Sequence, residues 1–187
     1  MTRLEQLLIN YKRHVALPLR PNLPLGQRVW FLVYPPEEER RLLLRIEDFH
    51  QATLEAQLGW QVINLKGALT LWLDSLEAEE REALLKDQPL LEDYASTGLR
   101  DFLAKMVQGV ADKVGPEQAP RTVFALTGLM EIYDLVGVSD LLDALTKQFT
   151  GNLALFFPGE KEGNSYRFLN ARTAWDYLAV PILSEAS

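Results

Sequence analysis

Four short apolar runs, each followed by a longer polar or amphipathic stretch, constrain the fold of this 187-residue chain more than any other feature. β-branched and aromatic residues fill these runs with little alternation, which is typical of strands covered on both faces. The runs are RVWFLVY (28–34), WQVINL (60–65), TVFALTG (122–128) and NLALFF (152–157). Buried strands separated by helices favour right-handed βαβ crossovers and therefore a parallel sheet.

The segments between the runs have the signals of helices. Pro36 suits the first position of a helix that ends near Gly59, and further helices are expected over 67–86, 90–114 and 139–149. The predicted fold class is α/β: a three-layer domain with a mostly parallel sheet flanked by helices, resembling a P-loop or Rossmann-like domain without a nucleotide-binding motif. We expect one domain over residues 1–187, with an amphipathic helix and a proline-rich arm in residues 1–27. The C-terminal segments YRFLN and YLAVPI are expected to add a strand or an edge segment.

Charge is unevenly distributed along the chain. The net charge is −7, but residues 3–28 hold five basic residues against one acidic, and residues 74–93 hold eight acidic residues against two basic. The acidic segment would repel phosphate backbones, which disfavours direct nucleic-acid binding. The absence of cysteine excludes disulfides and thiolate chemistry, and no apolar run approaches the length of a membrane span. We therefore expect a cytoplasmic protein without a membrane partner.

The loops that follow the strands lack the residues of known catalytic motifs. After the first run, YPPEEER has two prolines and three glutamates where a phosphate-binding loop needs glycines and a lysine. Thr127 stands at the tip of the third run, where a magnesium-binding aspartate would be expected. His14 and His50 belong to no metal-ligand spacing, and Ser165 lies outside a G-x-S-x-G motif. We predict no catalytic residue, metal site, cofactor or small-molecule substrate.

Three segments together resemble a known family: GQRVWFLVYPPEEERRLLLRI, TVFALTGLMEIYDLVGVSDLLDAL and LALFFPGEKEGNSYRFLNARTAWDYLAVPI. They are similar, in order and spacing over essentially the whole chain, to the BrxB family of bacterial BREX phage-defence systems. The FFPG, YRFLNAR and W-x-YLAVPI series is the most specific part, although Asn170 stands where the family often has aspartate. The resemblance implies a small cytoplasmic subunit beside a PglZ-type phosphatase-like protein, a large ATPase, a DNA methyltransferase and other BREX subunits. It implies no catalytic residue.

The leading functional hypothesis is a noncatalytic interaction subunit that docks a larger PglZ-type partner. Tyrosine, tryptophan and arginine dominate binding hot spots, and the candidate partner-binding residues are Tyr166, Arg167, Arg172, Trp175 and Tyr177. The alternative interpretation of these aromatic rings is that they fill the core of the sheet.

Two other functions compete with this hypothesis. One is a nucleotide- or DNA-binding regulatory domain, or an unrecognised hydrolase, that uses the strand-tip residues Lys66, Glu160, Ser165 and Arg167. The other is DNA contact through Arg13, Arg20 and Arg28, which the overall negative charge places third.

Overall fold

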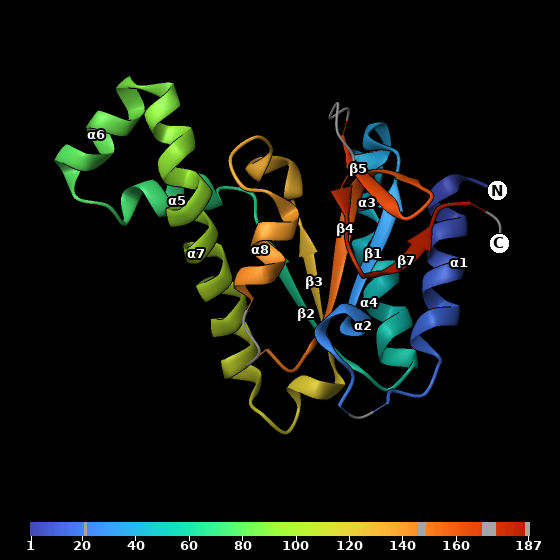
Figure 1. The fold of residues 1–187 in the computed structure, drawn as a ribbon. Helices are drawn as coiled ribbons and strands as arrows, with labels where there is room; N and C mark the ends of the chain where they lie inside the picture. Colours follow the sequence, from blue (N-terminus) through green and yellow to red (C-terminus); the bar gives the residue numbers. More distant parts are fainter. Residues whose placement is uncertain (21, 146–148, 170–174, 186–187) are drawn as a thin grey trace.

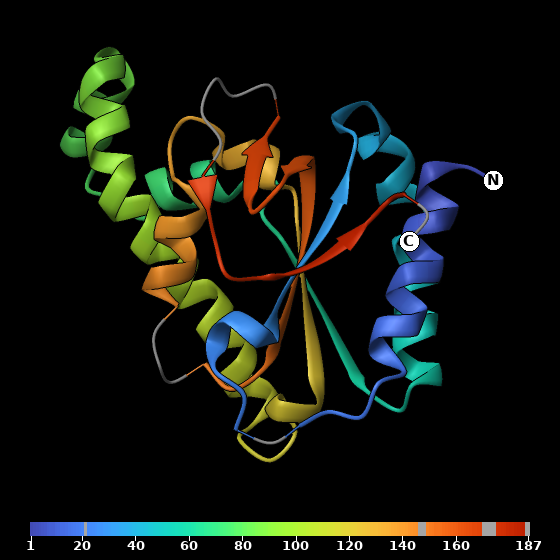
Figure 2. The ribbon, with the colours of Figure 1, turned by 45° about the vertical axis from the view of Figure 1, so that its right-hand side comes forward.

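The computed structural model describes residues 1–20, 22–145, 149–169 and 175–185, without the side chains of residues 175 and 176, and it confirms the predicted fold class (Figure 1). Within these residues, five parallel strands form the central sheet in the order β2-β3-β4-β1-β7. Helices cover both faces, which gives three layers (Figure 2). The strands are β1 (Val29–Tyr34), β2 (Gly59–Asn64), β3 (Thr122–Thr127), β4 (Asn152–Glu162) and β7 (Val180–Leu183).

The helices divide between the two faces of the sheet. One face is covered by α1 (Arg3–Val15), α3 (Glu39–Leu44) and α4 (Ile46–Glu55). The other is covered by α5 (Ala68–Asp74), α7 (Gln88–Val114) and α8 (Val138–Ala144), with α6 (Ala78–Lys86) packed on α7. A short α2 (Leu25–Arg28) leads into β1. Every residue of β1 is buried, because its alternate side chains enter the two separate cores.

The strand order places β1 inside the sheet, with β4 on one side and β7 on the other. From β1 the chain passes through α3 and α4 on one face to β2 at the far edge. It then returns toward β1 through β3 and β4, and the helices that connect these strands lie on the other face. Beyond β4 the chain passes β1 and adds β7, which confirms the expectation of an edge segment near the C-terminus. β1 and β4 are thus neighbours whose outgoing connections leave to opposite faces, and this defines a topological switch point at their carboxyl ends.

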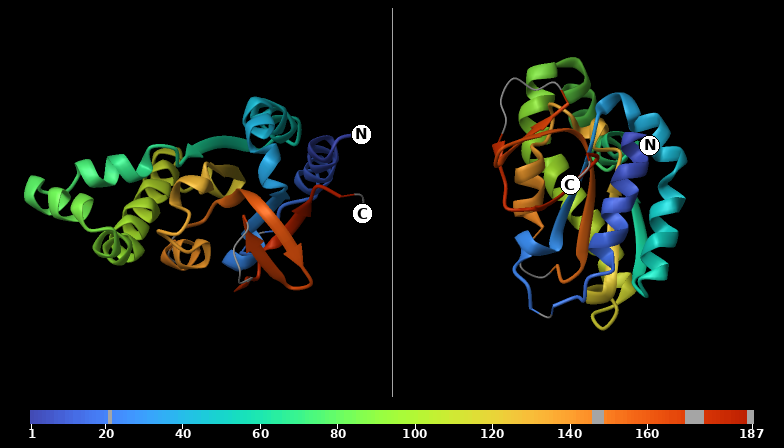
Figure 3. Two further views of the ribbon diagram at one scale, coloured as in Figure 1. Left: turned by 90° about the horizontal axis from the view of Figure 1, so that it is seen from above. Right: turned by 90° about the vertical axis from the view of Figure 1, so that its right-hand side faces the viewer.

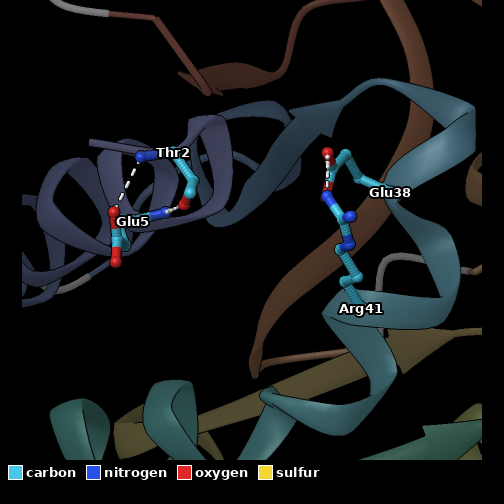
Figure 4. Close-up of polar contacts among 4 residues, drawn as sticks. All are labelled: Thr2, Glu5, Glu38 and Arg41. Carbon is cyan, nitrogen blue, oxygen red and sulfur yellow. Dashed lines mark hydrogen bonds and ion pairs between the residues drawn. The ribbon is translucent and has the colours of Figure 1, made fainter.

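Helix α1 is joined to the domain at several points. A capping box closes its start: the Glu5 amide donates to Thr2 Oγ1 (3.2 Å) and the Thr2 nitrogen donates to the Glu5 carboxylate (2.7 Å; Figure 4). Farther along, the buried hydroxyl of Tyr11 lies 2.6 Å from Thr53 Oγ1 of α4. Asn10 Nδ2 donates to two backbone carbonyls at and just after the end of β7. The N-terminal helix therefore holds the C-terminal strand in place, and Figure 1 shows both ends of the chain at one corner of the molecule.

The Phe-Phe-Pro-Gly signature marks the place where β4 leaves the central sheet. β4 extends to Glu162, five residues beyond the end that the sequence predicts. Its parallel pairing with β1 ends at Pro158, and from Gly159 onward it pairs antiparallel with β5 (Ser165–Phe168), which in turn pairs with β6 (Trp175–Asp176). A Cβ at position 159 would lie 2.1 Å from the carbonyl oxygen of Arg167. Glycine is therefore required for the two strands to approach this closely.

Several predicted boundaries are wrong for local reasons. The helix expected over 36–59 is a 3-10 turn (Pro36–Glu38) followed by α3 and α4, with a break at Arg45 (φ −111°, ψ 11°). Gln57, at φ 59°, ends α4 through a Schellman pattern of hydrogen bonds, whereas Gly59 belongs to β2. The helix expected over 139–149 ends at Ala144. None of the described helices is long and apolar enough to cross a membrane.

Candidate functional site

The switch point contains a cleft of about 320 Å³, which we call the carboxyl-end cleft. Parallel α/β sheets generally bind ligands at this position, outside the carboxyl ends of the strands. Residues that follow β1, residues of β4 and residues at the end of β7 form its walls, together with Arg3 from α1. The lining residues are Arg3, Val33, Pro35, Pro36, Glu37, Gly159, Glu160, Lys161, Leu169, Leu183, Ser184 and Glu185.

The chemistry of this cleft does not suit a phosphate group. Pro35 and Pro36 remove two backbone donors at the point where a phosphate-binding loop would supply them. Three lining carboxylates outnumber the two lining cations, so the cleft has a local charge of −1. One of the cations, Lys161, donates its Nζ to the backbone carbonyl of Gly163. The cleft therefore lacks the backbone donors and the net positive charge of an anion site.

Two of the three glutamates in YPPEEER have structural partners. Arg41 Nη1 lies 3.1 Å from the Glu38 carboxylate, an exposed ion pair along the start of α3 (Figure 4). The buried hydroxyl of Tyr34 donates to the Glu39 carboxylate. Burial raises the pKa of the Glu39 carboxyl above its ordinary value, whereas the hydrogen bond from Tyr34 opposes that rise. Only Glu37 of the three lines the cleft.

The Glu131 carboxylate lies at the tip of β2, next to Lys66. Gly67, which starts α5 at φ 81°, donates its amide to Glu131 Oε1 (3.2 Å). The Lys66 amide donates to the Asn64 side chain, and the Lys66 side chain is exposed. Among the described residues, no three histidine, aspartate or glutamate side chains gather closely enough to hold a metal ion.

The structure places the candidate partner-binding residues in different environments. Tyr166 is 1% exposed, and its ring packs against Phe31 (centroids 4.6 Å apart) and Phe157 (5.9 Å). Tyr177 is half-buried and stacks on Phe31. The alternative that the sequence left open, rings that fill the core, therefore holds for Tyr166 and in part for Tyr177. Burial also raises the pKa of both tyrosines.

Arg167 is half-buried and forms an ion pair within the β4–β5 hairpin. Its guanidinium pairs with the Glu162 carboxylate at 2.8 Å, while its buried Nε has no hydrogen-bond partner among the described residues. Arg172 lies outside the described residues, and of Trp175 only the backbone, in β6, is described. The partner-binding role of these positions stays a prediction.

The alternative strand-tip set is only partly brought together. Glu160 and Arg167 lie opposite each other in the β4–β5 ladder, and Ser165 lies opposite Glu162. Lys66 follows β2, which is separated from β4 by β3.

Both histidines lie away from the strand tips: His14 packs against Trp30 and His50 stacks on Trp60. Burial lowers the pKa of the His14 imidazole below its ordinary value.

A second candidate surface is the helical segment of residues 68–94, which we call the acidic projection. It comprises α5, α6 and the first turns of α7, and its α6 end stands clear of the sheet in Figure 1 and in the view from above in Figure 3. Its buried residues, such as Trp72 and Leu84, join the core of the α7 face. Large apolar side chains on its outer surface remain exposed, namely Leu71 (56%), Leu85 (63%) and Tyr94 (46%).

The acidic projection has almost no internal charge compensation. It contains eight carboxylates and two cations, and each cation is already paired: Arg81 with Asp74 (3.1 Å) and Lys86 with Glu82 (2.6 Å). The remaining six carboxylates have no ion pair among the described residues; they are Glu77, Glu79, Glu80, Asp87, Glu92 and Asp93. The sequence shows this acidic run, but it does not show the exposed apolar side chains beside it, because their exposure depends on the tertiary fold.

Comparisons of this chain with protein-family models, with curated proteins and with solved structures found no match.

Proposed function

We propose that this chain is a noncatalytic interaction subunit of a bacterial BREX anti-phage complex, which docks a PglZ-type partner. The acidic projection is the observation that carries the proposal. It combines six carboxylates without ion pairs and three exposed large apolar side chains on a segment that stands away from the sheet. The BREX assignment rests on the resemblance of the sequence to the BrxB family.

The chemistry of the projection defines the kind of surface that would bind it. Complementary potentials steer association and set specificity, so the partner's surface should be basic. Leu71, Leu85 and Tyr94 would supply apolar contact within that polar frame. Because none of these three side chains lies in the buried core, the fold does not depend on their exposed parts. Their exposure on an acidic surface fits a role in binding.

The carboxyl-end cleft supports the noncatalytic part of the proposal. Its prolines, its charge of −1 and the engagement of Lys161 by a backbone carbonyl leave it poorly suited to phosphate chemistry. The residues that line it include no histidine and no cysteine, and the single hydroxyl among them is that of Ser184. Among the described residues, the Ser184 hydroxyl makes no hydrogen bond to a lining carboxylate or lysine that could act as its base.

Charge reversal on the projection tests the proposed interface. Glu79→Lys/Glu80→Lys changes two exposed, unpaired residues of α6. The matched control is Asp112→Lys/Glu117→Lys, which makes the same change in net charge at the opposite end of α7. We expect the projection variant to bind the purified PglZ-type subunit at least about tenfold more weakly, which is about 1.4 kcal/mol. The control should stay within about twofold of the wild type.

The measurement is co-purification followed by isothermal titration at two salt concentrations. Wild-type binding should weaken as salt rises, because an interface of exposed charges is screened. No association at about micromolar concentration would contradict the proposed function itself. If both variants weaken the association equally, the proposed function would hold, but the acidic projection would not be the binding surface. Titration with ATP, GTP and short DNA tests the competing function, which binding tighter than roughly 100 μM would support.

A further inference from the structure

A second cavity, larger than the carboxyl-end cleft, lies at the opposite end of the sheet. Its volume is about 660 Å³, within the range of small-molecule sites. Its walls are the arm that follows α1, the end of α2, the turn after α4, the turn before β3 and the start of β4. Figure 2 shows the arm crossing beneath the amino ends of the strands. We call this the arginine cavity, after Arg20, Arg28 and Arg121 in its lining.

The charge of the arginine cavity is opposite to that of the whole protein. Three guanidinium groups line it, and none of the lining residues that the structure describes is acidic. The chain as a whole has a net charge of −7. Thr150 and Asn152 add polar side chains to the same wall. A concave site with three positive charges concentrates its field on an anion that enters it.

Arg28 is held in place by the backbone around it. Its Nε donates to the Leu23 carbonyl (3.0 Å), and its Nη1 donates to the carbonyls of Phe149 and Gly151 (2.8 Å each). A guanidinium has five N–H donors, and these three hydrogen bonds leave the two N–H groups on Nη2. Arg28 thus ties the arm to the start of β4 and still has a pair of donors on one nitrogen.

Arg121 and Arg20 complete the set with uncommitted guanidinium groups. Arg121 ends the 3-10 turn Ala119–Arg121, and the Asn152 side chain fixes that turn by donating to the Pro120 carbonyl (3.0 Å). Both arginine side chains are exposed, and neither makes a hydrogen bond or an ion pair with the residues that the structure describes. Two arginines whose donors are free therefore face the same cavity as the anchored Arg28.

We propose that the arginine cavity binds a small multivalent oxyanion, with phosphate or carboxylate groups held by Arg20, Arg28 and Arg121. The planar fork of arginine matches both groups in a two-pronged hydrogen bond, so the shared chemistry is the oxyanion. A multivalent ligand fits because three arginines line one cavity without any acidic residue in its described lining. The concave shape and the acidic remainder of the surface favour a small ligand over a nucleic-acid duplex.

Isothermal titration of the full chain at low salt tests this site, with inorganic pyrophosphate and citrate as the two probes. We expect one-to-one binding with a dissociation constant below about 1 mM for at least one probe. The stronger of the two identifies the preferred group as phosphate or carboxylate. Arg121→Ala should weaken binding at least about tenfold, and Arg121→Lys less, because lysine keeps the charge but loses the fork.

Arg13→Ala is the matched control, since Arg13 is an exposed arginine of α1 that does not line the cavity. It removes the same charge and should change the dissociation constant by less than about twofold. Unchanged thermal unfolding of the alanine variants would show that they remain folded. Absence of heat with both probes up to about 10 mM would overturn the proposal. So would equal weakening by Arg13→Ala, or tighter binding of duplex DNA than of either probe, since each indicates a diffuse basic surface.

Discussion

Substitution of Gly159 by alanine tests the structural account of the Phe-Phe-Pro-Gly signature. The new Cβ would lie 2.1 Å from the Arg167 carbonyl oxygen and 2.7 Å from the Phe157 ring. The carbonyl belongs to the backbone of β5, so β5 must retreat by about 1.3 Å to reach an ordinary contact of 3.4 Å. A shift of this size stretches the β4–β5 ladder and the neighbouring hydrogen bond from the Leu169 amide to the Pro158 carbonyl, which is 2.8 Å long.

The cost can be summed from two contributions. Loss of one or two hydrogen bonds costs about 1 kcal/mol each. Looser packing of the β5 rings of Tyr166 and Phe168 against Phe157 costs about 0.5–1.5 kcal/mol per ring pair. Gly159→Ala should therefore reduce the free energy of unfolding by about 2–5 kcal/mol, which corresponds to a fall in melting temperature of roughly 4–20 °C.

Urea denaturation followed by tryptophan fluorescence measures this change. Gly109→Ala is the control, because Gly109 lies inside α7 and a Cβ there meets no atom within 4 Å. The control should stabilise the protein by about 0.5–1 kcal/mol, since alanine restricts the unfolded chain and favours the helix. A Gly159→Ala variant within about 0.5 kcal/mol of the wild type would refute the close approach of β4 and β5.

Two further predictions concern one partly buried and one buried polar group. Arg28→Met should lower the free energy of unfolding by about 2–4 kcal/mol in the same urea assay, because three backbone carbonyls lose a charged donor; a variant as stable as the wild type would contradict the anchoring role. Burial raises the pKa of the Tyr11 hydroxyl above its ordinary value of 10.0, so its neutral form stabilises the fold below pH 10 and this contribution declines as the pH rises further. Tyr11→Phe should lower the free energy of unfolding by about 1 kcal/mol near neutral pH, because the hydrogen bond to Thr53 is lost. It should also make the urea midpoint less sensitive to pH above 10. If the pH dependence of the midpoint above pH 10 is unchanged, another group titrates there.

The central strands could be predicted from the sequence because each of them is a run of consecutive apolar residues. β1 and β3 are buried at every position, as continuous apolar runs predict. WQVINL contains a strand but not a buried one, since β2 lies at the sheet edge and Ile63 is the only buried residue within β2. Strand order decides which run lies at an edge, and strand order depends on contacts between distant segments.

The candidate sites were less predictable for the same reason. Tyr166 has the residue type of a binding hot spot, but the bend of β4 at Gly159 folds it onto Phe31 and Phe157. The arginine cavity combines residues about one hundred positions apart, so no local pattern signals it. The acidic run was visible in the sequence, whereas its position on a segment clear of the sheet required the structure.

Helix α7 runs from the acidic projection toward the arginine cavity. Its 27 residues form a rod about 40 Å long, whose first turns belong to the acidic projection. The other end is bonded through Gly115 and Ala119 to the turn that carries Arg121. Over that length, a tilt of about 3° at one end moves the other by about 2 Å, enough to make or break a hydrogen bond. The acidic projection and the arginine cavity therefore lie at opposite ends of one continuous helix, through which a displacement of one end would reach the other.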